Sequence, residues 1–298
     1  MELRDIDYFA VIAEHGHLGR AAETLGLGQP ALSMSLRRLE QSAQAKLVQR
    51  TPKGVELTAV GRALLSHVRR LKLARDDLAR EVADIAHART GELRIGASPA
   101  ITESLLPPAC IALFAHAPRV KVTVTQQDND TLLPALRDGE LDLVVIHAPM
   151  PPSGEVEQIH LRDDQFVVFC SARHRLAKRR SIKLVDVSEE SWACTPAGAA
   201  NWLQPIFRER GFPPPRLSLV SDSVTLRLST VASSGLVGIA SKRVVIGAAR
   251  RLGLAILRIT DQQWDRPIAL AYRRGTYLSP VMLRFIDILK ATGKEIVV

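Results

Sequence analysis

The sequence predicts an all-α amino-terminal domain, a long connecting helix and two lobes of the α/β class. Three observations support this prediction. Two short helical periodicities meet at Gly26, an uninterrupted helical pattern follows Thr58, and strands alternate with helices beyond Gly91. We therefore divide the chain into residues 1–58, 59–89 and 90–298.

The composition is that of an ordinary globular protein with a basic balance. Of the 298 residues, 46% are hydrophobic and 24% are charged, and the net charge is +9. A chain of this length accommodates two or more domains with cores of their own. The positive charge favours an anionic partner.

The cysteines and the amino terminus indicate the cellular setting. Cys110, Cys170 and Cys194 are widely spaced within apolar segments, which indicates core thiols rather than a disulfide framework or a metal site. Charged residues between Glu2 and Glu14 argue against a secretory signal peptide. Because no apolar run approaches the roughly 20 residues of a membrane span, we expect a cytoplasmic protein without a membrane partner.

The amino-terminal domain begins with a helix over residues 3–15, which we expect to pack over two shorter helices. The first of these has one apolar face, formed by Leu18, Ala21, Ala22 and Leu25. Gly26 follows that face, where a helix end needs a residue that accepts positive φ. The second begins at Gln29–Pro30, since proline is tolerated in a first turn. Its inward positions are Leu32, Leu36 and Leu39. This spacing predicts a helix-turn-helix.

The outward face of the second helix is polar and basic. Its amide and hydroxyl groups are able to read base edges, and its guanidinium groups are able to hold phosphates. The residues on this face are Gln29, Ser33, Ser35, Arg37 and Arg38. The alternative is a two-helix corner of an all-α domain with a solvated basic face.

A β-hairpin is predicted over Lys46–Leu57, with Thr-Pro-Lys-Gly as its turn. Arg50 and Lys53 on this hairpin make it a wing, placed to contact the DNA backbone or the minor groove. Between Arg20 and Arg75 eleven Lys and Arg residues stand against three Glu residues. Such a cluster is typical of a phosphate-binding surface, and it predicts affinity that falls steeply with salt.

A long helix is predicted from Thr58, as its cap, to about Arg89. Thirty residues of helix reach roughly 45 Å, which is more than one small domain needs. Leu64, Leu71, Leu78 and Ile85 repeat every seven residues, with Val68 and Val82 at intervening positions. The pattern favours a helix–helix seam between two copies of the chain. A lone linker helix resting on its own domain is the alternative.

Beyond Gly91 the pattern is βαβαβ, repeated in a second unit, which predicts parallel sheets with helices on both faces. Strands are predicted at residues 92–97, 120–125, 141–146, 166–170, 192–194, 217–220, 237–240 and 267–272. Helices are predicted to His116 and at residues 132–138, 202–210, 224–233 and 279–290. The last strand and helix return to the first unit, so lobe I is about 90–162 plus 267–298 and lobe II about 163–266.

The amino-terminal pattern resembles that of the LysR-type transcriptional regulators. The matching residues are Arg20-Ala21-Ala22, Leu25, Gln29-Pro30-Ala31-Leu32-Ser33, Leu39-Glu40, Leu47, Arg50, Val55, Leu57-Thr58 and Gly61. The departures are Gly28 where Ser is usual, Met34 where Arg is common, and Gln44 and Val48 where Gly and Phe are usual. Met34 offers an apolar contact, for example to a thymine methyl group.

The resemblance implies a winged helix-turn-helix domain, a dimer-forming linker helix, and a two-lobed effector domain like that of periplasmic binding proteins. It implies double-stranded DNA as a partner and a homodimer or homotetramer as the assembly. The expected DNA contacts are Arg20, Gln29, Pro30, Ser33, Met34, Ser35, Arg37, Arg38, Arg50 and Lys53.

A ligand cleft is expected where the carboxyl ends of the strands of both lobes meet. The loop Ser98-Pro99-Ala100 and the loop Thr195–Asn201 offer backbone N–H groups and polar side chains that suit a small carboxylate or sulfonate. The expected effector contacts are Ser98, Pro99, Ala100, Thr102, His147, Thr195, Asn201 and Ser221. The alternative is that these hydroxyl groups only cap helices.

Catalysis has little support in the sequence. The eight histidines form no HExxH motif and no His–Cys metal spacing, and there is no G-x-S-x-G elbow. We therefore expect no catalytic residues, no metal and no cofactor. The basic run Arg173–Arg180 follows a predicted strand, and we interpret it as an exposed loop.

Three functions remain. The favoured one is a DNA-binding transcription regulator whose binding responds to a small organic acid between the lobes. A cytoplasmic two-lobed binding protein without a role in gene regulation is the alternative, and the basic first ninety residues argue against it. An enzyme on the same scaffold would lack a nucleophile or a metal constellation.

Overall fold

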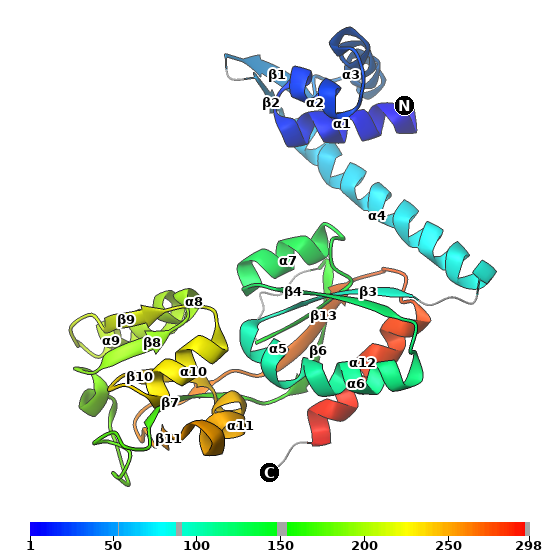
Figure 1. Ribbon diagram of the computed structural model, residues 1–298. Coiled ribbons are helices and arrows are strands. Elements are labelled where there is room, and N and C mark those ends of the chain that lie inside the picture. Colours follow the sequence, from blue (N-terminus) through cyan, green and yellow to red (C-terminus); the bar gives the residue numbers. More distant parts are fainter. Residues whose placement is uncertain (53, 88–90, 148–153, 296–298) are drawn as a thin grey trace. The chain divides into compact units, whose positions relative to one another are not determined.

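The computed structural model describes residues 1–52, 54–87, 91–147 and 154–295. Two compact units divide the chain, Met1–Ala86 and His87–Val298, and each is described by itself (Figure 1). No helix of the described residues is long and apolar enough to cross a membrane.

The first unit contains four helices and one hairpin among its described residues. They are α1 (Leu3–His15), α2 (Leu18–Thr24), α3 (Gln29–Ala43), β1 (Val48–Thr51), β2 (Gly54–Leu57) and α4 (Ala59–His87). Side chains of α1, α2, α3 and the start of α4 share one core, whose buried members include Phe9, Ile12, Ala21, Leu32 and Leu39. The apolar periodicity of residues 3–39 thus supplies the core that fixes α2 against α3.

The turn between α2 and α3 has the conformation that the sequence indicates. Gly26 adopts a φ of 64°, and the Leu27 N–H donates to the Ala22 carbonyl at 2.9 Å. Gln44, at the end of α3, adopts a φ of 49°. This left-handed position explains why the resembled family places glycine there.

The hairpin is held on both sides. The Val55 N–H donates to the Gly16 carbonyl at 2.8 Å, which ties the wing to the end of α1. The Thr58 hydroxyl donates to the Lys46 carbonyl at 2.7 Å and accepts from the Gly61 N–H at 3.0 Å. Thr58 therefore caps α4 and anchors it to the segment that leads into β1 of the wing.

The first sheet of the second unit has the order β4-β3-β5-β13-β6. Its strands are β3 (Glu92–Ala97), β4 (Lys121–Gln126), β5 (Leu143–His147), β6 (Val156–Arg162) and β13 (Ile268–Arg273). Helices α5 (Pro99–Ser104), α6 (Leu106–His116) and α12 (Pro280–Glu295) cover one face, and α7 (Asn129–Arg137) covers the other. We call this part lobe I.

The second sheet has the order β11-β7-β10-β8-β9, with β12 beside β7. Its strands are β7 (Gln165–Ser171), β8 (Ser191–Cys194), β9 (Arg216–Val220), β10 (Val237–Ser241), β11 (Leu254–Leu257) and β12 (Trp264–Asp265). Helices α10 (Val224–Ala232) and α11 (Lys242–Leu252) cover one face. The other face is covered by the 3-10 helix η1 (Leu184–Val187), α8 (Pro196–Gly198), the π-helix η2 (Ala199–Leu203) and α9 (Gln204–Glu209). We call this part lobe II.

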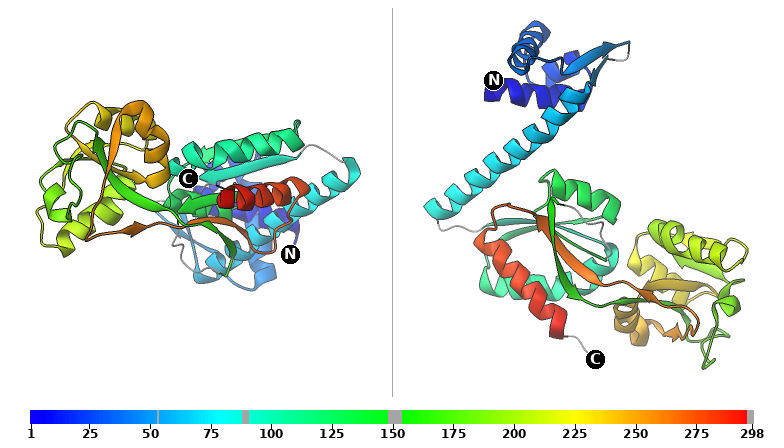
Figure 2. Two further views of the ribbon diagram at one scale, coloured as in Figure 1. Left: turned by 90° about the horizontal axis from the view of Figure 1, so that it is seen from below. Right: turned by 180° about the vertical axis from the view of Figure 1, so that it is seen from behind.

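Two chain crossings join the lobes, and they run side by side (Figure 2). The Arg266 N–H donates to the Asp164 carbonyl at 2.8 Å, so one crossing is bonded to the other. Both sheets are mixed, because β13 lies antiparallel to β5 in the first sheet and β7 lies antiparallel to β10 in the second. The prediction of parallel sheets is therefore wrong for these strands.

Most predicted elements are present within a few residues of their expected ends. The helix expected at residues 202–210 instead begins at Pro196 and passes through η2. Elements β6, η1, α11, β11 and β12 were not predicted. The run Arg173–Arg180 is a series of turns, and two of its arginines pair locally, Arg175 with Glu190 and Arg179 with Asp186. This result agrees with the interpretation of an exposed loop.

Candidate functional site

The exposed face of α3 is the candidate DNA-reading surface. Gln29, Pro30, Met34 and Arg37 are all exposed, and Met34 reaches 59% exposure. Ser33 is half-buried beside them. Gln41 extends the same face, four residues beyond Arg37, and the sequence analysis missed it. The surface combines amide, thioether and guanidinium groups, which is the mixture that reads a major groove.

Ser35 does not belong to this surface, and its prediction as a DNA contact is wrong. It is 1% exposed, and its hydroxyl donates to Oδ1 of Asp5 on α1. Arg38 also binds Asp5, through Nη2 at 2.6 Å and Nε at 3.2 Å, while its side chain stays 43% exposed. The position of the Arg38 guanidinium is therefore fixed by α1.

The Asp5 carboxylate sets the orientation of α3 on α1. Its hydrogen bond with Arg38 lowers the pKa of Asp5, against the opposing effect of burial. The pKa of the folded state is thus below that of the unfolded chain. The stabilisation that Asp5 contributes is present above the unfolded pKa and is lost as the pH falls through the folded pKa.

We expect Asp5→Asn to lower the free energy of unfolding of the amino-terminal unit by about 1–3 kcal/mol at pH 7, because it leaves Arg38 and Ser35 without their charged acceptor. The difference from the wild type should shrink in acid, because the stabilisation by the ionised Asp5 is lost as the pH falls from the unfolded pKa toward the lower folded pKa. Urea unfolding at pH 7 and pH 3 measures it. An equal loss at both pH values would contradict the role of the charge.

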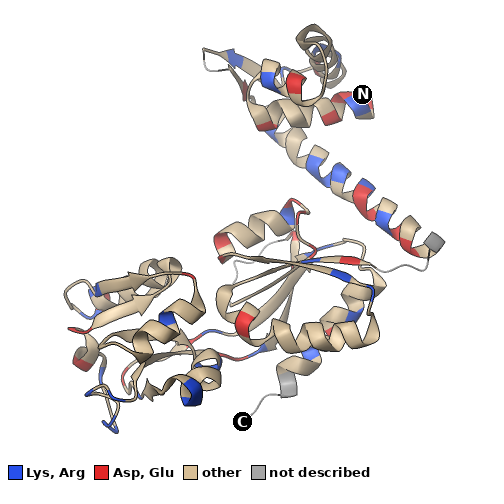
Figure 3. Cartoon of the chain, viewed as in Figure 1, with Lys and Arg blue, Asp and Glu red and all other residues tan. Residues whose placement is uncertain are grey.

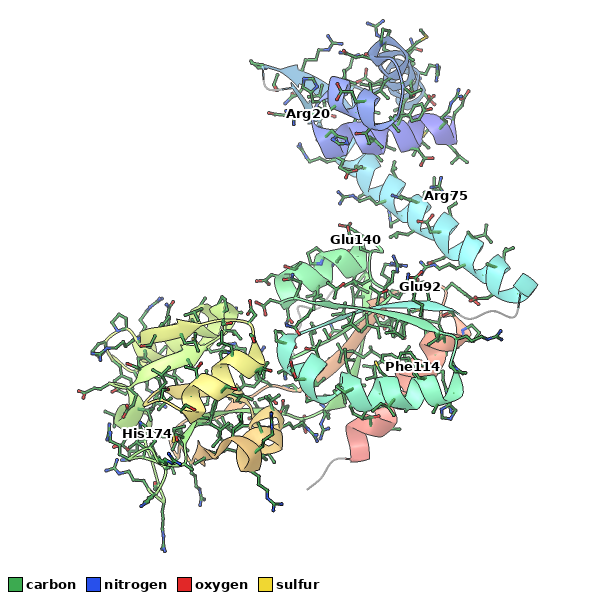
Figure 4. All side chains as sticks on the ribbon, in the orientation of Figure 1. Arg20, Arg75, Glu92, Phe114, Glu140 and His174 are labelled. Atoms are coloured by element: carbon green, nitrogen blue, oxygen red, sulfur yellow. The ribbon has the colours of Figure 1, made fainter. Side chains whose placement is uncertain are left out.

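The basic residues around α3 are accessible in the described structure. Arg20 on α2 and Arg50 on β1 are exposed, and the Arg20 side chain is labelled in Figure 4. In Figure 3 the Lys and Arg positions, blue on the cartoon, fall on β1 of the wing and along α4. Lys53, predicted as a wing contact, lies outside the described residues.

The second candidate site is a cavity of about 260 Å³ between lobes I and II. Six of the eight predicted effector contacts line it together: Ser98, Pro99, Ala100, His147, Thr195 and Asn201. Thr195 caps α8, since its hydroxyl accepts from the Gly198 N–H at 2.9 Å. The cavity thus has polar groups from both lobes, as the position of the strand ends predicts.

Thr102 and Ser221 are not among the residues that line the cavity. The Thr102 hydroxyl lies 2.7 Å from the Pro99 carbonyl, inside lobe I. The Ser221 hydroxyl accepts from the Ser223 N–H at 3.1 Å in the turn before α10. The Thr102 hydroxyl also lies 2.6 Å from Oε1 of Gln126 on β4. Neither side chain caps a helix, since Thr102 lies within α5 and Ser223 is the cap of α10, so the alternative that these hydroxyl groups only cap helices does not describe these two residues.

A row of buried polar residues connects the two lobes beside the cavity. Ser98 Oγ lies 3.3 Å from Nδ1 of His147, and Nε2 of His147 lies 3.2 Å from Oδ2 of Asp164. The hydroxyl of Ser241, at the end of β10, donates to the same Asp164 oxygen at 2.7 Å. Asp164 lies in a chain crossing, so the row links lobe I, the crossing and lobe II.

The residue types of this row are those of a hydrolase triad, but the surrounding backbone does not suit one. In such enzymes the backbone N–H groups at and beyond the nucleophile stabilise the oxyanion. Pro99, which follows Ser98, has no N–H, and the Ser98 N–H already donates to the Val145 carbonyl at 3.3 Å. The row is therefore a structural link rather than a catalytic one.

The sequence analysis missed the two cations that line the cavity, Arg227 and Arg266. Arg227 is 4% exposed, although it lies on α10 among apolar residues. Arg266 stacks on Trp202, with its guanidinium carbon 4.2 Å from the ring centroid. Burial lowers the pKa of both guanidinium groups. The helical spacing of Arg227 with Val224, Leu228 and Val231 was a usable signal for its burial.

The described residues include no group of three or more His, Cys, Asp or Glu side chains that could hold a metal ion. Cys170 and Cys194 are fully buried in lobe II, and Cys110 is half-buried. Burial raises the pKa of the Cys170 thiol to about 11. These thiols are therefore packing groups rather than nucleophiles.

Two protein families match the chain. "Bacterial regulatory helix-turn-helix protein, lysR family" matches residues 3–62, and "LysR substrate binding domain" matches residues 86–294. A relative from Pseudomonas sp. (strain ATCC 19151), the "SDS degradation transcriptional activation protein", is 34% identical over 94% of this chain and 92% of its own. The regulator CbbR of Rhodospirillum rubrum is 25% identical over 98% of this chain and 97% of its own.

Solved structures share the fold. CbnR, a LysR family transcriptional regulator, has a TM-score of 0.61 at 22% identity, over 99% of this chain and 100% of its own. Full-length OxyR of Pseudomonas aeruginosa has a TM-score of 0.66 at 23% identity, over 99% of this chain and 95% of its own. A further structure shows full-length CbnR with its target DNA, at a TM-score of 0.55 and 24% identity, over 99% of this chain and 100% of that one.

Proposed function

This chain belongs to the LysR family of DNA-binding transcriptional regulators, and we propose that a small organic acid bound between its lobes controls its affinity for DNA. The family consists of regulators, not enzymes, in agreement with the absence of catalytic motifs from the sequence. An effector-binding domain on a helix-turn-helix also rules out the alternative of a binding protein without a role in gene regulation.

The observation that carries the effector proposal is the cavity itself. It draws Ser98 and His147 from lobe I and Thr195 and Asn201 from lobe II into one small space. A ligand that contacts both lobes favours one arrangement of them over another, and so shifts the population of states that bind DNA. Because such a regulator acts on DNA, we place it in the cytoplasm.

We propose that α3 enters the major groove with Gln29, Pro30, Ser33, Met34 and Arg37, while Arg20, Arg38, Arg50 and Lys53 hold phosphates. The exposure of the α3 face and the local positive charge support this assignment. Two such helices, one from each copy of a dimer, would read two half-sites in successive turns of the duplex.

We propose that α4 joins two copies of the chain. Its apolar row is exposed beyond the first turns, with Leu71 at 45%, Leu78 at 60%, Val82 at 55% and Ile85 at 77% exposure. Solvated apolar residues at heptad spacing are typical of a helix–helix seam. A homodimer or a homotetramer is compatible with this seam.

The test of DNA binding uses the double-stranded DNA just upstream of the gene for this protein. We expect Arg50→Ala to weaken binding to every sequence alike and to lower the slope of log affinity against log salt by about one unit, because one phosphate contact is lost. Gln29→Ala should instead reduce the preference for the upstream DNA over unrelated DNA, with the slope unchanged. Anisotropy titrations at four salt concentrations measure both.

The contrast between these two variants makes the assignment testable. An unchanged salt slope for Arg50→Ala would show that the hairpin does not contact the backbone. If the wild-type dimer did not bind the upstream DNA at low salt, the proposal that this DNA is its operator would be wrong.

A peroxide response is a second candidate function, since some relatives are named as probable hydrogen peroxide-inducible genes activators. Peroxide reacts with accessible thiolates. In this chain burial raises the pKa of all three cysteines, which keeps them in the thiol form. We therefore favour a bound organic effector over thiol oxidation.

A further inference from the structure

Arg227 is a buried cation to which the described part of the chain supplies no counter-ion. Its Nη1 donates to the Ile239 carbonyl at 3.2 Å, and its Nε makes no hydrogen bond. Among the described residues, no carboxylate forms an ion pair with it, and the groups whose charges raise its pKa against burial are Cys194 first and Asp222 second. A single neutral carbonyl cannot replace the water that a guanidinium loses on burial.

This arrangement costs folding free energy. A buried charge that lacks its partner is among the more destabilising features of a protein interior, and an apolar residue of similar size is often better tolerated. Val224, Leu228 and Val231 lie on the same face of α10 and are buried, so an apolar residue would fit the pattern there. The charge of Arg227 is therefore useful only when an anion is bound beside it.

The other residues that line the cavity indicate the shape of that anion. Arg266 also has an Nε without a hydrogen-bond partner, and it covers one side of Trp202. The ring of Trp202 meets the ring of Phe166 edge to face, with centroids 4.6 Å apart, and both side chains are only partly buried. An aromatic wall therefore adjoins the cationic end of the cavity, and such a wall suits a flat ring.

The acidic residues of the cavity limit the charge of its ligand. Asp128 and Asp130 line the same space, and burial together with Asp222 and Asp130 raises the pKa of Asp128. A second negative group on the ligand would meet these carboxylates and be repelled. The charges that line the cavity therefore suit a ligand with one anionic group, bound beside the guanidinium groups.

We propose that Arg227 is the anion anchor of the effector site, and that the effector is a small aromatic monoanion, a carboxylate or a sulfonate. Its oxygens accept from the free N–H groups of Arg227, and its ring lies against Phe166 and Trp202. This inference rests on the proposed function of the cavity as the effector site, and it names the residue and the ligand class.

The test is thermal unfolding of the full chain with three probes of one shape: benzoate, benzenesulfonate and the neutral benzamide. At a concentration near one hundred times Kd, we expect at least one of the two acids to raise the Tm of the effector-binding unit by about 5 °C. Benzamide should not raise it. Arg227→Met should abolish the acid-induced shift, while Arg250→Met, a matched change at an exposed arginine of α11, should retain it.

The Tm of Arg227→Met without ligand is a second measurement. An anchor role predicts that this Tm rises, whereas a purely structural role predicts that it falls. Since Arg227→Met removes an unpaired buried charge, we expect its Tm without ligand to lie about 2–4 °C above that of the wild type. A lower Tm would mean that the bond to Ile239 stabilises the fold, and it would overturn the anchor role.

The proposal would also be overturned if benzamide stabilised the wild type as well as the acids did, if Arg227→Met kept the shift, or if neither acid had an effect. Its failure is separable from that of the proposed function. If aliphatic acids such as acetate or succinate changed DNA binding equally in the wild type and in Arg227→Met, the regulator would still respond to an organic acid, and only the anchor and the aromatic class would be lost.

Discussion

The double substitution L78D/V82D is expected to leave the protein monomeric and to weaken its binding to a two-half-site operator by at least about 100-fold. Leu78 and Val82 are each more than half exposed in the single chain, so the change does not disturb the core of the amino-terminal unit. In a seam between two copies, four buried carboxylates would face one another, which the seam cannot accommodate. Sedimentation equilibrium and anisotropy titration measure the two effects.

The matched control is Ala83→Asp, which adds a carboxylate to an exposed position on another face of α4. It should retain both the assembly and the DNA affinity. Loss of DNA affinity by L78D/V82D without any change in its sedimentation would show that α4 does not form the seam. An unchanged circular dichroism spectrum at 222 nm would confirm that α4 is still helical.

The amino-terminal unit could be predicted from the sequence because its signals are local. Gly26 ends α2, Pro30 opens α3, and Thr58 caps α4, all within one or two turns of the residues that they affect. A helix reveals its buried face through spacing alone. These elements need no knowledge of distant contacts.

Ser35 shows where attention to residue type misled the prediction. It lies three residues after Leu32 and four before Leu39, so helical spacing places it on the inward face. Its hydroxyl group suggested a base contact, but its acceptor is Asp5, thirty residues earlier in the chain. Spacing could have predicted its burial, whereas the partner could not be identified from the sequence.

For Arg227 in lobe II, too, spacing could have predicted the burial but not the surroundings. Its spacing with Val224 and Val231 marks a charged residue on an apolar helix face, which is rare and informative. The cavity around it could not be predicted, because it joins α10, the chain crossing at Arg266 and the end of β5, which are far apart in the sequence. Only the strand-end loops at Ser98 and Thr195 had a topological signal.

We expect Gly61→Ala to lower the stability of the amino-terminal unit by about 3 kcal/mol, the upper end of overpacking effects. A Cβ atom at this position would lie 2.0 Å from the carbonyl oxygen of Leu47 and 2.9 Å from its carbonyl carbon. Both are backbone atoms, and the same oxygen accepts from the Thr58 N–H at 3.0 Å. The wing therefore cannot yield to the methyl group unless the start of α4 moves away.

The start of α4 joins the wing to the proposed dimer seam. We therefore expect Gly61→Ala to lose DNA binding as well as stability. For a unit of this size a loss of 3 kcal/mol lowers the Tm by roughly 12–24 °C, which calorimetry of the full chain resolves. Gly247→Ala is the control, because its Cβ would meet open space on α11. That change should be neutral or should stabilise its helix by up to about 1 kcal/mol. If both variants melted like the wild type, the close contact between α4 and the wing would not constrain the fold, and the glycine would have no structural reason to stand there.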